Sequence, residues 1–94
     1  MQADSLVAWV SHKIEGVLQE VPGIGPKGAI KFEEAGISTT FQLMGKFCMF
    51  KTADMADSQE LCNAFYTWLG EIGVNSHRAS LTLCVAEKCG VAFP

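Results

Sequence analysis

The apolar positions along the chain recur at helical spacing over most of its length. Over residues 4–19, apolar side chains three and four positions apart alternate with charged ones, a pattern that predicts one amphipathic helix. Comparable patterns predict four more helices, at residues 26–35, 39–50, 58–73 and 75–89. The polar residues 52–56 predict a loop between the third and fourth helices. The chain is therefore expected to form an all-α, compact five-helix domain.

Residues near the ends of these segments support the boundaries. Pro26 suits the first position of a helix, where its missing N–H would have no intrahelical partner. Gly36 suits the left-handed position that follows a helix. Thr39 and Gln42 have the spacing of a capping box, and Asn75 is expected to cap the last helix. These signals divide the chain into helices joined by short connections.

The apolar sides of the helices predict the core. Trp9 is expected to pack inside it rather than to stack on a ligand. The third helix is expected to lie at the centre of the core because it is strongly apolar, with Phe41, Leu43, Met44, Phe47, Cys48 and Phe50. On the last helix, the residues expected to face inward are Leu81, Cys84, Val85 and Cys89.

Length and composition fit a single globular domain spanning residues 1–94. Hydrophobic residues make up 49% of the chain, which is enough to bury a core without a disulfide or a structural metal. No apolar run approaches the roughly 20 residues that a membrane span needs. The N-terminus also lacks the pattern of a secretory signal. The protein is therefore expected inside the cell, in the nucleus or the cytoplasm.

The four cysteines lie in apolar helical stretches and include no C-x-x-C pair; they are Cys48, Cys62, Cys84 and Cys89. Inside the cell they are expected to stay reduced and to pack as small hydrophobic side chains. A metal or disulfide framework is the alternative. No cofactor is predicted.

The most informative motif is Val-Pro-Gly-Ile-Gly at residues 21–25, which has the apolar-x-Gly-Ile-Gly pattern of a helix-hairpin-helix at residues 18–36. Glycine lets the backbone turn tightly and approach a ligand, and Ile24 is expected to anchor the turn in the core. Free N–H groups at the start of the following helix, together with its dipole, favour an anion there. Gly23, Ile24 and Gly25 are therefore predicted to contact phosphate.

Two lysines after the hairpin make double-stranded DNA the expected source of that phosphate. Lys27 and Lys31 are one turn apart, so both can contact neighbouring phosphates from one helix face. Residues 21–51 hold four lysines and two glutamates, although the whole chain has a net charge of -3. Such binding would be independent of base sequence and sensitive to salt. Pro26 removes one donor from the site, and a plain connection between helices is the alternative interpretation. A monovalent cation held by the hairpin carbonyls is left open.

The sequence offers no convincing catalytic group. Ser76 and His77 are adjacent, so on a helix their side chains point apart and cannot act as nucleophile and base. His77 and Arg78 are expected on the solvated first turn of the last helix, with a phosphate contact by Arg78 as the less favoured reading. Asp54 and Asp57 are isolated carboxylates in a polar loop. The protein is therefore expected to be no enzyme and to hold no metal ion.

Several short motifs follow one another in a distinctive order. They are Gly23-Ile24-Gly25, Lys31, Glu33-Glu34, Gly36, Met44-Gly45-Lys46-Phe47 and Trp68-Leu69, with a fainter match from Asn75 to the last helix. In this order they resemble the barrier-to-autointegration factor family, over roughly residues 18–90. The resemblance implies a five-helix, SAM-like fold that dimerises and bridges double-stranded DNA without sequence preference. It also implies DNA contacts by Gly23, Ile24, Gly25 and Lys31, whereas Lys27 is added from its position alone.

The chain departs from that family pattern in three places. Its N-terminal segment is a plain amphipathic helix, its connection between the third and fourth helices is longer, and its surface is more acidic. The family uses basic residues near its N-terminus on DNA, where this chain offers only His12 and Lys13. The alternative function is therefore a protein-interaction domain that keeps the hairpin only as architecture.

Overall fold

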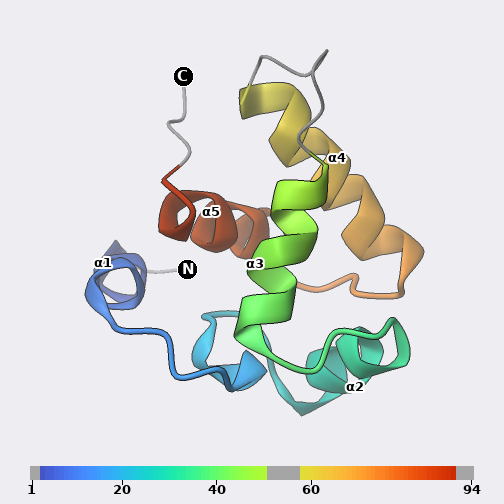
Figure 1. The fold of residues 1–94 in the computed structure, drawn as a ribbon, viewed down its shortest axis with the longest axis horizontal. Helices are drawn as coiled ribbons and strands as arrows, with labels where there is room; N and C mark the ends of the chain where they lie inside the picture. The colour runs from blue at the N-terminus through green and yellow to red at the C-terminus, as the bar shows by residue number, and fades with distance from the viewer. Residues whose placement is uncertain (1–2, 51–57, 91–94) are drawn as a thin grey trace.

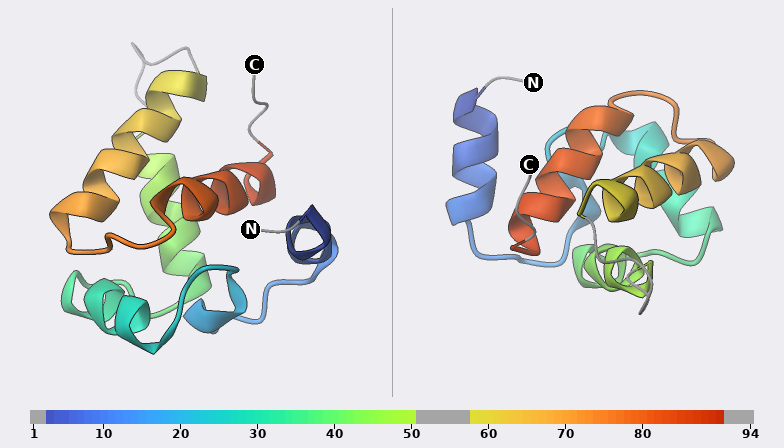
Figure 2. Two further views of the ribbon diagram at one scale, coloured as in Figure 1. Left: turned by 180° about the vertical axis from the view of Figure 1, so that it is seen from behind. Right: turned by 90° about the horizontal axis from the view of Figure 1, so that it is seen from above.

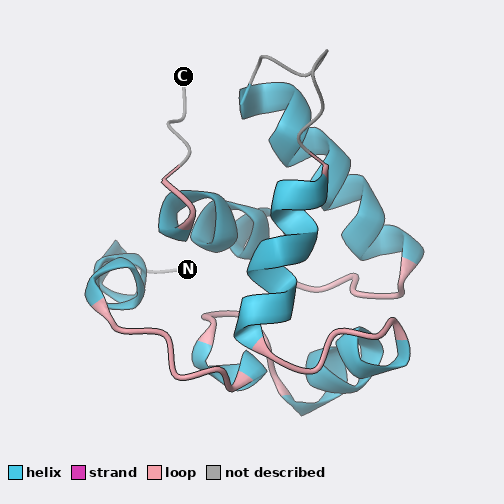
Figure 3. Cartoon of the chain, viewed as in Figure 1, coloured by secondary structure: helices cyan, strands magenta, loops and turns pink. Residues whose placement is uncertain are grey.

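The computed structural model describes residues 3–50 and 58–90, and in these ranges the chain is helical without a β-strand (Figure 3). The elements are α1 (Ala3–Ser11), the short 3-10 helix η1 (Leu18–Glu20), α2 (Pro26–Glu34), α3 (Thr40–Met49), α4 (Ser58–Glu71) and α5 (Arg78–Lys88). The predicted all-α fold with five α-helices is confirmed over these residues. The loop predicted at residues 52–56 lies outside the described residues.

Helix α5 lies inside the assembly of helices and contacts α1, α3 and α4. In Figure 1, α1 lies on one side of α5 and α4 on the other, while η1 and α2 form the lower layer. The view from above in Figure 2 shows the same arrangement, with α1 standing apart from α4. The inward-facing residues predicted on the last helix are confirmed for Leu81, Cys84 and Val85, which are buried, whereas Cys89 is half-buried.

An aromatic cluster joins α2, α3 and α4. The ring of Phe65 lies 5.3 Å from Phe47 and 5.5 Å from Trp68, measured between centroids. Phe32 of α2 reaches the same cluster at 6.1 Å from Trp68. Phe32, Phe47 and Phe65 are buried, so these contacts hold the hairpin region on the rest of the core.

Helix α3 is only partly in the core, which corrects one expectation. Leu43 and Phe47 are buried as predicted. Phe41, however, is 59% exposed, and Cys48 is also exposed. The helix is apolar on more than one side. Its buried side packs on η1 and α5 and, through Phe47, on Phe65 of α4, whereas Phe41 and Cys48 are exposed.

The predicted N-terminal helix at residues 4–19 is wrong beyond Ser11, because α1 ends there. The ammonium group of Lys88 bonds the carbonyls of Trp9 at 2.5 Å and Val10 at 3.3 Å, and also that of His12. A cation at these carbonyls stabilises a helix end. Trp9 is buried as predicted, and its indole N–H donates to the Cys84 carbonyl at 2.9 Å.

The segment after α1 is fixed by the carboxylate of Glu20. It accepts hydrogen bonds from the amides of Glu15 at 3.0 Å and Gly16 at 2.8 Å. It also accepts from the Thr40 hydroxyl at 2.7 Å, and its Oε1 lies 2.9 Å from Nε2 of His12. Burial raises the pKa of this carboxyl group, but the hydrogen bonds outweigh burial and lower the pKa of Glu20 to about 2. Glu20 therefore ties the 12–17 segment to η1 and α3.

The helix boundaries predicted from local sequence signals agree with the structure at α2 and α3 but not at the start of α5. Pro26 begins α2, and Gly36 follows it with φ of 88°, both as predicted. The capping box of Thr39 and Gln42 is present at α3. Asn75 is not the cap of α5, because that helix begins two residues later than predicted and His77 occupies its N-cap position.

Among the residues described, no helix combines the length and apolar character needed to cross a membrane.

Candidate functional site

The turn at residues 21–25 is built around Gly23 and Ile24. Gly23 has φ of +99°, a left-handed conformation that strains residues with a side chain. A Cβ at this position would also lie 3.3 Å from Cβ of His77. Ile24 is buried and its amide donates to the Val21 carbonyl at 3.1 Å. The turn is therefore anchored by one apolar side chain and packed closely against the segment before α5.

The backbone around the start of α2 presents N–H groups without an internal acceptor. Within the described ranges, the amides of Gly23, Gly25, Lys27 and Gly28 donate to no protein group, and the first bond of the helix runs from Ala29 to the Gly25 carbonyl at 3.0 Å. Such amides, together with the positive end of the helix dipole, favour an anion. Pro26 contributes no donor, as predicted. Because Ile24 uses its amide inside the turn, it anchors the site rather than donating to a ligand.

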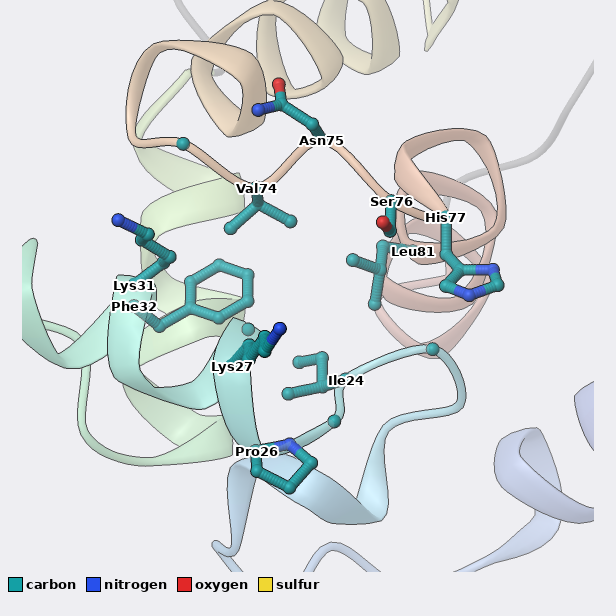
Figure 4. Close-up of a pocket in the computed structure, with 14 residues that line it drawn as sticks. Ile24, Pro26, Lys27, Lys31, Phe32, Val74, Asn75, Ser76, His77 and Leu81 are labelled. Atoms are coloured by element: carbon teal, nitrogen blue, oxygen red, sulfur yellow. The ribbon is translucent and has the colours of Figure 1, made fainter.

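A cleft separates this turn from the segment between α4 and α5 (Figure 4). Its volume is about 900 Å³. One wall comprises Gly23, Ile24, Gly25, Pro26, Lys27, Gly28, Lys31 and Phe32; the other comprises Gly73, Val74, Asn75, Ser76, His77 and Leu81. Ile24, Phe32, Val74 and Leu81 are buried, so the base of the cleft belongs to the core while its rim is polar.

The charged side chains that line the cleft have one sign. They are Lys27 and Lys31, and the lining also contains the imidazole of His77 but no carboxylate among the described residues. Both lysines are exposed. The stem of Lys31 lies against Gly73, where a Cβ would be 3.3 Å from Cδ, so this glycine gives the lysine room. The structure thus brings all five predicted phosphate-binding residues to one wall of the cleft.

The opposite wall was not predicted from the sequence. Asn75, Ser76 and His77 line the cleft, and His77 has φ of 60°, which is uncommon for a residue other than glycine. The first backbone bond of α5 runs from Leu81 to the His77 carbonyl, which leaves a second helix N-terminus beside the cleft. Gly73, with φ of 91°, marks the end of α4 in the sequence, but only the Ser-His pair could have drawn attention to residues 75–77 as a candidate site.

Arg78 contacts Tyr66 of α4 and does not line the cleft. Its guanidinium lies 4.3 Å from the centroid of the Tyr66 ring and donates to the Tyr66 carbonyl at 3.4 Å. Gly70 leaves room for the guanidinium in this position, because a Cβ there would lie 2.5 Å from Nη1. Arg78 therefore joins α5 to α4.

Groups for metal or acid–base chemistry are sparse. In residues 3–50 and 58–90, no group of three or more His, Cys, Asp or Glu side chains could hold a metal ion. Asp54 and Asp57 lie outside those ranges. Comparisons of the chain with protein-family models, with characterised proteins and with solved structures found no match.

Proposed function

We propose that the protein binds the phosphate backbone of double-stranded DNA without sequence preference, at the wall of the cleft formed by residues 23–31. The observation that supports this proposal most is the set of unsatisfied amides at the start of α2, which open onto a cleft with three basic groups and no carboxylate in its lining. A phosphate oxygen satisfies such amides and is favoured by the helix dipole. The resemblance to the barrier-to-autointegration factor family supports the same ligand.

In this proposal η1, the 21–25 turn and α2 act as a helix-hairpin-helix within a SAM-like domain. The first helix of the hairpin is short, since η1 has three residues. Glu20 at its end is held by hydrogen bonds from the 12–17 segment, which compensates for that length by fixing the entry to the turn. The hairpin is thus positioned by a polar network on one side and by Ile24 on the other.

The lack of sequence preference follows from the residues that meet the DNA. Gly23 and Gly25 have no side chain that could read a base edge, and backbone amides contact every phosphate alike. Lys27 and Lys31 lie one turn apart on α2, so their ammonium groups extend the contact to neighbouring phosphates. The cost of this arrangement is sensitivity to salt, because binding releases counterions from the DNA.

The proposal includes a second copy of the chain, packed on the exposed side of α3, so that two hairpins bridge two duplexes. Phe41 is 59% exposed and Met49 is 75% exposed, and Gly45 between them has open space around it. Phe41, Gly45 and Met49 are spaced four residues apart and so lie along one side of α3, where a second copy could pack closely. Self-association would cover them in both copies at once.

An alternative function uses the same side of α3 for a different protein and leaves the hairpin as architecture. The observation that favours it is the same exposed apolar side chains, Phe41 and Met49, which fit any apolar partner. This alternative predicts that the cleft does not bind DNA, so a titration with DNA distinguishes the two functions.

Fluorescence anisotropy of a labelled random-sequence duplex tests the DNA proposal, at about 50 and 200 mM salt, where phosphate contacts dominate. We expect the wild type to bind and to weaken with salt, with a slope of about 0.9 in log affinity per phosphate contacted. Lys27→Glu/Lys31→Glu should abolish binding. Thr67→Glu, which adds one negative charge at an exposed position of α4 outside the cleft, serves as the control and should retain it. Absence of binding by the wild type at about 100 μM protein and low salt would rule out the proposal, because non-specific DNA binders register in that range.

A further inference from the structure

Three sulfur atoms gather where α3 meets the end of α5. Met44 and Cys48 are four residues apart on α3 and so lie on the same side of that helix. The thiol of Cys89, at the end of α5, donates to the Met44 sulfur at 4.0 Å. Burial and then the neighbouring Cys48 thiol raise the pKa of Cys89 to about 12, so the Cys48 and Cys89 side chains lie beside each other. We call Met44, Cys48 and Cys89 the sulfur cluster. None of the three lines the cleft, so the cluster is separate from the proposed DNA site.

The sulfur cluster is accessible without being fully solvated. Cys48 is exposed, whereas Met44 and Cys89 are half-buried against the core. An ion can therefore reach the thiol of Cys48 from solvent and then be shielded by the other two side chains. Cys62 and Cys84, by contrast, are buried.

The sulfur atoms of these three residues determine which metal ion the cluster can bind. Thiolate and thioether sulfur are soft ligands that favour Cu(I), whereas hard cations require oxygen. A structural Zn²⁺ site needs four ligands drawn from Cys, His and carboxylates. Over the described residues no such group of even three is present, so the cluster does not suit Zn²⁺.

The distance between the Cys89 and Met44 sulfur atoms also fits a three-coordinate ion. Three sulfur atoms, each about 2.3 Å from a metal as in protein zinc sites, stand about 4 Å from one another in a trigonal plane. The Cys89 and Met44 sulfur atoms already lie 4.0 Å apart. We propose that Met44, Cys48 and Cys89 form a binding site for Cu(I), with two thiolates and one thioether as ligands.

Binding in this site is an exchange of protons for a metal ion. The two thiol protons of Cys48 and Cys89 pass to solvent, and Cu(I) takes their place between the two thiolates without a change in oxidation state. The thioether of Met44 completes the coordination without losing a proton. The bound ion would link α3 directly to the C-terminal end of α5.

The test is a titration of the full chain with Cu(I), without oxygen and in competition with a chromophoric Cu(I) chelator. We expect one tightly bound ion per chain. Cys89→Ser should weaken Cu(I) binding by roughly 100-fold or more, and Met44→Leu by at least about tenfold. Loss of a residue that only hydrogen-bonds a metal ligand already weakens metal binding by about 10–100-fold, and loss of a ligand itself should cost at least as much. X-ray absorption should show three sulfur neighbours in the wild type and two in Met44→Leu.

Two control variants remove the same kinds of sulfur elsewhere. Met49→Leu deletes an exposed thioether near Cys48, and Cys62→Ser deletes a thiol outside the cluster. Both should keep the wild-type affinity, with circular dichroism confirming that every variant is folded. Equal affinity in Met44→Leu, Cys89→Ser and the wild type would mean that Cys48 alone captures the ion, and this overturns the proposal. Formation of a Cys48–Cys89 disulfide in place of metal binding would overturn it as well.

Discussion

Replacement of Glu20 by glutamine tests the polar network that positions the hairpin. The change keeps the shape of the side chain but replaces one acceptor oxygen by an NH₂ group. In the wild type, the two carboxylate oxygens of Glu20 accept hydrogen bonds from different donors. Oε1 accepts from the Glu15 amide, whereas Oε2 accepts from the Gly16 amide and the Thr40 hydroxyl. In either orientation of the amide, at least one of these donors loses its acceptor.

The pKa of Glu20 gives the magnitude. A lowering from 4.5 to about 2 corresponds to at most about 3–4 kcal/mol of stability at neutral pH, at 1.36 kcal/mol for each pKa unit. Because the side chain remains 9% exposed and in contact with solvent, we expect about 2 kcal/mol. Since the folded-state pKa lies below the unfolded one, this stabilisation is complete above about pH 5 and is lost as the pH falls towards about 2.

Urea denaturation followed by circular dichroism measures the effect at pH 7 and pH 3. The difference in unfolding free energy between the wild type and Glu20→Gln should be about 2 kcal/mol at pH 7 and clearly smaller at pH 3, where the wild-type carboxyl group has lost part of its contribution. Glu60→Gln, an exposed change on α4, serves as the control and should shift the midpoint little. A Glu20→Gln difference that is below about 0.5 kcal/mol at pH 7, or that does not depend on pH, would mean that the Glu20 carboxylate does not stabilise this segment.

Three further predictions concern the turn, α1 and α3. Gly23→Ala should lower the unfolding free energy by about 1–2 kcal/mol, because residue 23 has a φ of +99°. Residue 25 has an ordinary φ and free space for a Cβ, so Gly25→Ala should leave the fold intact and weaken only duplex binding. Equal thermal shifts for these two variants would contradict the turn geometry. Lys88→Met should release the end of α1, seen as faster amide hydrogen exchange over residues 6–12 with little change in α4. Phe41→Ser/Met49→Ser should keep the stability of the folded chain but convert a dimer into a monomer in analytical ultracentrifugation; a wild type that is already monomeric at high concentration argues against self-association.

The parts of the fold that the sequence predicted well depend on neighbours in the chain. The start of α2 at Pro26 and the capping box at α3 each involve residues no more than three positions apart. The same holds for Gly36, whose left-handed conformation ends α2. Such signals are local, so periodicity and capping rules are enough to find them.

The parts that sequence reasoning missed depend on residues far apart. Helix α1 ends at Ser11 because Lys88 binds its last carbonyls and Glu20 holds the segment that follows. The pattern of residues 4–19 does not indicate either contact. Phe41 and Cys48 were expected in the core because apolar spacing does not say which side of an apolar helix has a partner. One wall of the cleft was predicted from Gly-Ile-Gly, while the wall at residues 75–77 required the fold.

Two-dimensional ¹H–¹⁵N NMR of the protein during titration with a random-sequence duplex shows directly whether the amides at the start of α2 bind DNA phosphate. The amide signals of Gly23, Gly25, Lys27 and Gly28 should shift first and furthest, and added salt should reverse the shifts. Shifts confined to α3, or no shifts at all at low salt, would mean that the hairpin does not bind DNA and would favour a protein-interaction domain.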